Sequence, residues 1–192
     1  MYVLGLNMFN PNLEKLFINK HVTLLVTYDL DCHQNLYDNL YCELSDEDID
    51  FFEVPLNPQT KEQDQAPCDL VMEIENALQD EFGGAITPAH LLIDLEKVTH
   101  YYGQLSHIEE FCAQLLKIND IAQKQNLGIT LLINMNEPWS AATTVADYID
   151  HNVPTSKNDF IIFAMTDKNP NLLTYANGKD KPQKLDLDNF AN

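Results

Sequence analysis

Apolar residues follow two different spacings along the chain, and the two spacings alternate. Short continuous apolar runs occur in "HVTLLVTYDL", "AHLLIDLEKV", "GITLLINM" and "DFIIFAM", as in strands that are buried on both faces. Between these runs the apolar residues recur about every 3.6 positions, which is the period of a helix. The alternation predicts βαβ units and therefore an α/β fold. We expect a single-layer, largely parallel or mixed sheet of four to six strands, with helices packed on its faces.

Three helices are predicted between the strands. The first carries a stripe of apolar residues and ends at a pair of glycines. The second opens with Ser106 and Glu109, which match the pattern of a capping box, and runs to Gly128. The third has Pro138 near its first position, where a missing amide proton costs no hydrogen bond. The residues expected to face inward are Leu70, Val71, Ile74, Leu78 and Phe82; Ile108, Phe111, Cys112, Leu115, Ile118 and Ala122; and Trp139, Ala142, Val145, Ala146 and Ile149.

The segments outside this regular pattern lie near the two ends and between residues 43 and 66. The 192 residues suit one α/β domain, 1–192, with a single core. A short helix is predicted after Asn10. Residues 43–66 are interpreted as an acidic insertion, within which "DFFEVPL" is typical of an edge strand. "NLLTYA" predicts a further short strand, and a loose C-terminal tail is expected at about 178–192.

The acidic charge balance narrows the classes of binding partner. The chain has 30 Asp and Glu against 11 Lys and no Arg, so its formal net charge is -19. Nucleic acids and anionic membrane surfaces are disfavoured as partners, because cations would be needed to neutralise their phosphates. The same negative field attracts and orients a basic protein. Solubility alone is an equally good explanation of the charge at this point.

The four cysteines do not match a metal or redox motif. Cys32, Cys42, Cys68 and Cys112 show no CxxC spacing. The N-terminus lacks the basic region and the apolar run of a signal peptide, and no stretch of the chain is long enough to span a bilayer. We therefore expect a cytoplasmic protein with reduced thiols, no metal and no cofactor.

The stretch "LLVTYDLDCHQN" places two carboxylates directly after the first strand. Ligands of α/β sheets usually bind at the carboxyl ends of strands, so Asp29 and Asp31 are candidate catalytic residues. They resemble the aspartate pair of haloacid-dehalogenase-type phosphotransferases, with Asp167 as a faint echo of that family's acidic metal motif. The resemblance implies a divalent-metal-dependent hydrolase or phosphotransferase. We favour the alternative, a polar turn whose aspartates bond their own backbone, because the pair continues into Cys32 and His33 instead of the family's residues.

The middle of the chain carries a second family pattern, in the order "HLLIDLEKVTHYYGQLSHIEEFCAQL", "GITLLINMNEP", "VADYI" and "DFIIF". An apolar strand ends at Asp94, Gly103 follows in a loop, and Leu105 begins the next helix. This order resembles the STAS family, the anti-sigma-factor-antagonist fold, over most of residues 22–163. The resemblance implies the fold of that family. Two tyrosines stand where many members carry a phosphorylatable Ser ahead of the glycine, so it does not imply a phosphorylation switch.

Acidic and aromatic residues together predict a protein-binding surface. Carboxylates would set the rate and orientation of association, and aromatic rings would supply a desolvated anchor. The predicted function is a non-enzymatic interaction module, such as an inhibitor, immunity or regulatory protein that binds a basic partner. The tyrosines that follow the second strand are expected at the surface, because they precede a capped helix. The predicted binding residues are Glu43, Asp46, Glu47, Asp48, Asp50, Phe51, Phe52, Glu53, His100, Tyr101 and Tyr102.

Overall fold

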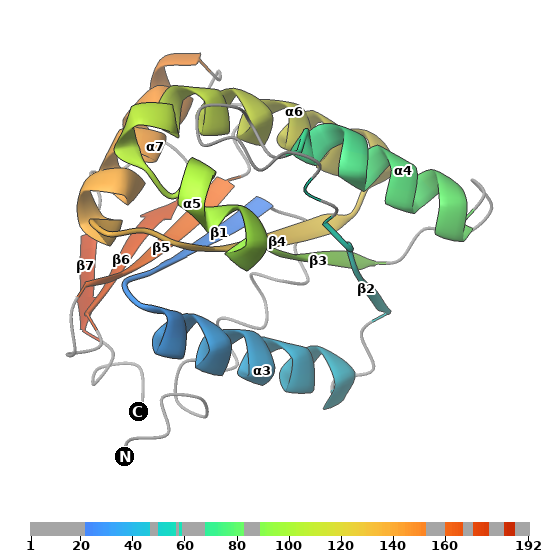
Figure 1. The fold of residues 1–192 in the computed structure, drawn as a ribbon, viewed down its shortest axis with the longest axis horizontal. Helices are drawn as coiled ribbons and strands as arrows, with labels where there is room; N and C mark the ends of the chain where they lie inside the picture. The colour runs from blue at the N-terminus through green and yellow to red at the C-terminus, as the bar shows by residue number, and fades with distance from the viewer. Residues whose placement is uncertain are drawn as a thin grey trace.

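The continuous apolar runs of the sequence form the central strands of one sheet, with helices on both faces (Figure 1). The structure, a computed structural model, describes residues 22–46, 50–56, 58, 68–82, 89–152, 160–166, 171–176 and 183–186. The predicted α/β class is confirmed. The strands are β1 (Val22–Thr27), β2 (Phe51–Glu53), β3 (His90–Asp94), β4 (Gly128–Asn134), β5 (Phe160–Thr166), β6 (Asn171–Ala176) and β7 (Gln183–Asp186). The helices are α3 (Leu30–Asp46), α4 (Leu70–Phe82), α5 (Thr99–Tyr102), α6 (Ile108–Gln125) and α7 (Pro138–Asn152), with the short 3-10 helices η1 (Glu96–Val98) and η2 (Leu105–His107).

Seven strands pair in the order β2-β3-β4-β1-β5-β6-β7. The first five are parallel to one another, and β6 and β7 extend the sheet with antiparallel pairing. The sheet is one strand larger than the predicted range. The additional strand, β7, lies in the segment that we expected to be a loose tail, so that expectation is wrong for residues 183–186. Its sequence "QKLD" has no apolar run, and the strand is defined by its backbone pairing with β6.

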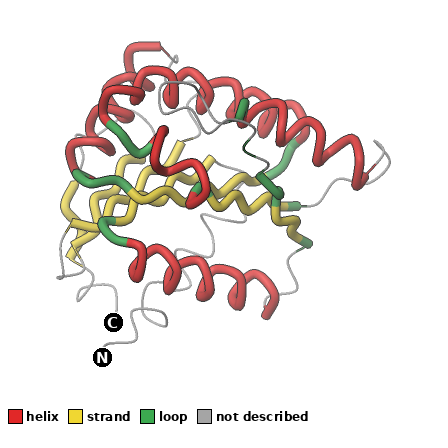
Figure 2. Tube along the Cα trace, in the orientation of Figure 1, coloured by secondary structure: helices red, strands yellow, loops and turns green. Residues whose placement is uncertain are grey.

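The direction in which the chain crosses the sheet decides which face each helix covers. After β1 the chain passes β4 and β3 to the edge strand β2, then returns through β3 and β4 before crossing β1 to β5. Parallel connections are right-handed, so movements in opposite directions place their helices on opposite faces. Helix α3 accordingly lies below the sheet in Figures 1 and 2, and α4, α6 and α7 lie above it. The carboxyl ends of β1 and β4, whose helices leave on opposite faces, form the switch point of the topology.

The two faces of the sheet differ in composition. The face under α4, α6 and α7 is apolar, and Leu24, Val26, Leu91, Ile93, Ile129, Leu131 and Ile133 belong to its core. The α3 face is identified by Thr27 and Asp94, since both contact a side chain of α3. Side chains alternate along a strand, so Thr23 and His90 lie on this face too. His90 Nε2 is 2.8 Å from the hydroxyl of Thr130, and the α3 face is therefore partly polar although it is buried.

Most predicted helix boundaries agree with the structure, with two exceptions at α6. The predicted capping box is absent: His107 occupies the N-cap position, and no side chain caps this end of the helix. The helix ends at Gln125 and is followed by the C-cap residue Asn126, which adopts the left-handed conformation at φ 60°, two residues before the predicted stop at Gly128. Gly128 instead begins β4. Helix α7 starts at Pro138 as predicted.

Two further expectations concern the chain ends and membrane association. The helix predicted after Asn10 lies outside the described residues. None of the helices within the described ranges combines the length and the apolarity needed to cross a membrane.

Candidate functional site

The stretch "YDLDCHQN" contains the beginning of helix α3. The Oδ1 atom of Asp29 accepts a hydrogen bond from the backbone N–H of Cys32 at 2.6 Å, and the carbonyl of Asp29 accepts one from the N–H of His33 at 3.0 Å. Asp29 is therefore the N-cap of α3. Asp31 is exposed in the first turn, where the helix dipole favours a negative charge. The prediction that an aspartate bonds its own backbone is confirmed for Asp29, whereas the 17-residue helix that follows was not predicted.

Asp29→Ala is expected to lower the free energy of unfolding by about 1 kcal/mol, because the N–H of Cys32 loses its acceptor. Asp29→Asn keeps an oxygen acceptor and should retain most of the stability. Urea unfolding followed by circular dichroism measures both variants, with Asp31→Ala as a control on a neighbouring acid within the first turn. An equal loss in Asp29→Ala and Asp29→Asn would show that the cap is not what Asp29 contributes.

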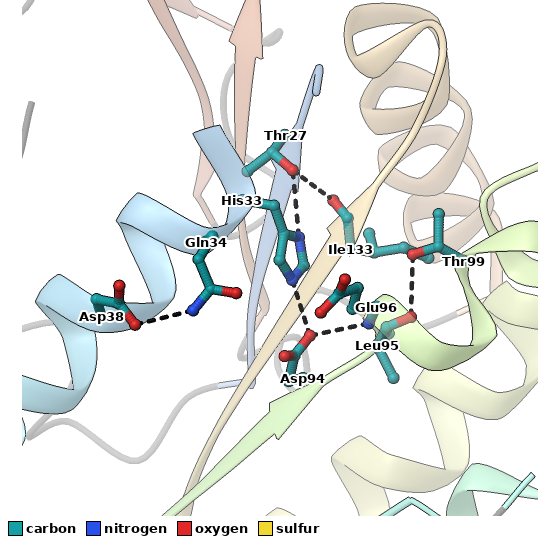
Figure 3. Close-up of polar contacts among 9 residues, drawn as sticks. All are labelled: Thr27, His33, Gln34, Asp38, Asp94, Leu95, Glu96, Thr99 and Ile133. Atoms are coloured by element: carbon teal, nitrogen blue, oxygen red, sulfur yellow. Dashed lines mark hydrogen bonds and ion pairs between the residues drawn. The ribbon is translucent and has the colours of Figure 1, made fainter. Parts of the chain in front are cut away.

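A buried histidine on α3 connects the ends of two strands (Figure 3). His33 Nε2 lies 2.7 Å from Oδ1 of Asp94, which ends β3, and Nδ1 lies 3.3 Å from the hydroxyl of Thr27, which ends β1. The Thr27 hydroxyl also lies 3.4 Å from the carbonyl of Ile133 on β4, to which it donates. The imidazole ring thus ties β1 and β3 to the first turn of α3, and Thr27 extends the contact to β4.

The hydrogen bonds of this group orient His33 and favour the ionised form of Asp94. Nε2 faces a carboxylate oxygen and therefore donates to it. The Thr27 hydroxyl lies within hydrogen-bond distance of both Nδ1 and the carbonyl of Ile133, and it donates to that carbonyl at 3.4 Å. Burial raises the pKa of Asp94, but the hydrogen bonds from His33 and from the N–H of Glu96 outweigh it and hold the pKa below its ordinary value. The hydrogen bond between His33 and Asp94 joins α3 to the sheet.

This Thr–His–Asp arrangement is closed to substrates. Thr27 is fully buried and His33 is 1% exposed, so neither the hydroxyl nor the imidazole can reach a reacting group. Only the Asp94 side chain, at 25% exposure, reaches the surface. A nucleophile needs access as well as an adjacent base, so we assign this group a structural role.

The described residues do not support a metal centre. They include no group of three or more His, Cys, Asp or Glu side chains arranged to hold a metal ion. Asp29 uses one carboxylate oxygen as a helix cap, and Asp31 is exposed in the first turn of the helix. The third candidate, Asp167, lies outside the described residues. The aspartates of α3 are therefore explained by helix formation.

A row of three aromatic rings lies where α3 runs beside the edge strand β2. The ring centroids of Tyr37 and Tyr41 are 6.3 Å apart, and those of Tyr41 and Phe51 are 5.2 Å apart in an edge-to-face arrangement. Tyr41 is 45% exposed, and the other two rings are half-buried. Burial, followed by a hydrogen bond to the Glu53 side chain and its negative charge, raises the pKa of Tyr37, so its hydroxyl stays protonated and donates to Glu53.

Carboxylates flank this row. Asp38 follows the first tyrosine, and Asp50 precedes the phenylalanine; both are exposed, as is Glu53. Helix α3 contains no Lys or Arg, and the lysine side chains that the structure describes lie on η1 and α6, at Lys97, Lys117 and Lys124. We define the α3–β2 surface as Tyr37, Asp38, Tyr41, Asp50, Phe51 and Glu53.

The predicted surface cluster at His100, Tyr101 and Tyr102 is corrected by the structure. Tyr102 is completely buried and Tyr101 is 4% exposed, so only His100 lies at the surface. The hydroxyl of Tyr102 donates to the carbonyl of Cys68 at 2.8 Å, and that of Tyr101 donates to Glu110 at 2.7 Å. Both tyrosines are packing residues beneath α6, with their polar ends satisfied.

The remaining predicted binding residues divide according to position. Asp50 and Glu53 are exposed, while Phe51 and Phe52 are half-buried. Phe52 packs against the apolar core on the opposite face of the sheet from α3. Glu43 and Asp46 lie near the end of α3, so the predicted acidic insertion begins within a helix. Glu47 and Asp48 lie outside the described residues.

Sequence reasoning missed Tyr37 and Tyr41, two of the three aromatic residues of the α3–β2 surface. Their spacing of four residues places two rings on one side of a helix, and this signal is present in the sequence. This spacing brings the two rings to one side only if the segment is helical, and no helix was predicted for it.

No family model and no curated protein matches the chain. The resemblances to the STAS family and to haloacid-dehalogenase-type enzymes therefore stay predictions. The residues of this chain are the basis for assigning a function.

Proposed function

We propose that this protein is a non-enzymatic interaction module that binds a basic protein partner through the α3–β2 surface. The observation that carries the proposal is an aromatic row that reaches the surface at Tyr41, with carboxylates beside it and no Lys or Arg on the same helix. An aromatic row on the surface of an acidic chain offers an apolar anchor that only a cationic or neutral surface can approach favourably.

The two kinds of side chain have different tasks in this proposal. Tyr41 and Phe51 provide area that is removed from water on binding, and tyrosine is enriched among the residues that dominate binding energy. Lys or Arg side chains of the partner can also lie over the ring faces. Asp38, Asp50 and the net charge of -19 attract the partner and orient it before contact. This division of tasks suits an inhibitor or immunity protein that covers a basic active site, such as that of a nuclease.

The state of the cysteines is consistent with a reducing compartment, which the proposal takes to be the cytoplasm. None of the four cysteines forms a disulfide bond, and three are buried. Burial raises the pKa of Cys32 and of Cys68 to about 11 and that of Cys112 to about 12, so these thiols are protonated. Protonated buried thiols are inert as nucleophiles, in line with a binding function.

The proposal is tested by capturing the partner on the full chain at low salt, purifying it, and measuring its Kd with matched variants. Asp38→Asn combined with Asp50→Asn should weaken binding about tenfold or more, and Tyr41→Ala should do the same. The control pair, Glu75→Gln and Asp120→Asn, removes the same charge from exposed positions of α4 and α6. It should change the Kd by no more than about twofold.

Salt provides a second criterion. Affinity for the wild-type chain should fall steeply as ionic strength rises, because the exposed charges are screened. The fall should be smaller for the Asp38 and Asp50 double variant. Equal losses in the test and control pairs, or an affinity that does not respond to salt, would overturn the proposal.

A further inference from the structure

A hollow with a volume of about 360 Å³ lies at the carboxyl end of β4, on the face of the sheet opposite α3. One wall is the loop between α5 and α6, from Gly103 to Ser106, and the other is the β4–α7 connection with the first turn of α7. The hollow is adjacent to the switch point of the topology, the region in which open α/β sheets usually bind their ligands. It shares no residue with the α3–β2 surface.

The backbone packing of one glycine fixes the loop that forms this wall. A Cβ atom at Gly103 would lie 2.5 Å from the carbonyl oxygen of Thr99 and 2.6 Å from that of Asn134. The loop is thus in direct contact with the last residue of β4 and leaves no space there for a side chain. Ala141, on the opposite wall, is also too small to fill the space. The backbone contact at Gly103 therefore sets the position of this wall.

The lining residues define the chemistry of a ligand. Met135 and Ala141 are buried and give an apolar floor, and Leu105, at 44% exposure, adds apolar surface at the rim. The other side chains of the rim are the neutral polar groups of Gln104, Ser106 and Asn136, and the carboxylate of Glu137. Among the described residues, the lining therefore carries one negative charge and no positive charge.

The charges of the lining side chains disfavour an anion as the ligand. A phosphate or carboxylate would meet Glu137 without a basic side chain in the described lining to neutralise it, within a chain whose net charge is -19. A cation would gain a charge-assisted hydrogen bond to the carboxylate. Contact with the apolar floor adds to the binding free energy only when the cation carries an apolar part.

We propose that this hollow binds a small organic amine, whose ammonium group pairs with Glu137 and whose apolar part rests on Met135 and Ala141. The volume is near the lower end of that of ordinary ligand pockets, which limits the occupant to a small molecule. The site is separate from the surface proposed for the protein partner, so either proposal can fail without the other.

The probe is benzylamine, titrated into the full-length chain labelled with nitrogen-15 and followed by two-dimensional NMR. The amide signals of residues 103–106 and 135–141 should shift in a saturable way. Benzyl alcohol, which keeps the ring and loses the charge, should bind about tenfold more weakly, and benzoate should bind more weakly still. The same hierarchy should hold at a second ionic strength.

Two matched variants separate a site from a general attraction of cations. Glu137→Gln removes the charge at the rim and should weaken benzylamine binding about tenfold. Glu96→Gln makes the same change at an exposed position after β3 and should leave binding within about twofold of wild type. Ser106→Phe, which places a ring on the exposed rim, should block the hollow and abolish the shifts. Thermal unfolding of each variant reports whether it is folded.

Three results would overturn the proposal. The first is an absence of saturable shifts in these two segments at millimolar benzylamine. The second is binding of benzoate as tight as that of benzylamine, which would mean that the N-terminus of α7 outweighs Glu137. The third is an equal loss in Glu137→Gln and Glu96→Gln, which would mean that net charge alone attracts the probe.

Discussion

Asp94→Ala is expected to lower the free energy of unfolding by about 3 kcal/mol, a larger loss than we expect for Asp29→Ala or Gly103→Ala. The substitution leaves Nε2 of His33 without its 2.7 Å acceptor in a site where the ring is 1% exposed. A buried donor that loses its partner incurs its full desolvation cost, and the cost rises when the group is charged. The N–H of Glu96 loses an acceptor as well.

Denaturant unfolding of the variant at neutral pH measures this loss. Asp38→Ala is the matched control, because its carboxylate is exposed and bonds to an exposed Gln34; it should cost less than about 0.5 kcal/mol. His33→Leu combined with Asp94→Leu removes both polar partners and should recover part of the stability lost in Asp94→Ala. If Asp94→Ala lowers the free energy of unfolding no more than Asp38→Ala does, the carboxylate of Asp94 does not stabilise the buried His33.

The pH dependence of the same variant follows from the sign of the shift at Asp94. Its pKa in the folded state lies below the ordinary value of 3.8, so the folded state favours the ionised carboxylate. The stabilisation is complete above that ordinary value and is lost as the pH falls through the lower pKa of the folded state. The Asp94 carboxylate should therefore contribute fully to the stability difference between wild type and Asp94→Ala well above pH 3.8. This contribution should shrink as the pH falls below 3.8.

Gly103→Ala is expected to destabilise the protein by about 2 kcal/mol. The backbone of Gly103 is in the ordinary helical region, at φ -75° and ψ -3°, so an alanine would suffer no conformational strain. At such a position the change normally stabilises a protein by about 0.4 to 1 kcal/mol, through the unfolded chain. Here the added methyl would meet two backbone carbonyl oxygens, neither of which can move without displacing α5 or β4.

The sign of the measured effect therefore decides whether this contact is as close as the structure shows. Gln104→Ala, at the exposed neighbouring residue, is the control and should change the free energy of unfolding by less than about 0.5 kcal/mol. A stabilised Gly103→Ala protein would contradict the packing of the loop against β4.

The elements that could be predicted from the sequence are those whose own residues carry the signal. β1, β3, β4 and β5 are continuous apolar runs, and α4, α6 and α7 have apolar stripes of the correct period. Helix α3 was missed because one of its inward positions is His33, a polar residue within an otherwise short stripe of Cys32, Leu36 and Leu40. The group that makes a buried histidine acceptable is Asp94, 61 residues away, and local pattern cannot reveal it.

The α3–β2 surface could also be predicted only in part, because only some of its features are local in the sequence. The acidic and aromatic character of the β2 segment is local, so Asp50, Phe51 and Glu53 could be identified. The exposure of a tyrosine depends on what packs over it: Tyr102 follows a strand end, as a surface residue can, yet lies beneath Phe111 of α6. The packing of α6 over Tyr102 makes this residue buried, and the composition of the segment does not reveal that packing.

The position of β1 in the centre of the sheet has a consequence for the order of events in folding. The bond between Thr27 and Ile133 joins residues 106 positions apart, and β5, the other neighbour of β1, follows still later. At a synthesis rate of roughly 5 to 20 residues per second, β1 waits roughly 5 to 20 seconds for β4. During synthesis β3 and β4, which are connected through α6, can therefore pair before β1 has a partner, and β1 stays exposed to chaperones and to aggregation until then.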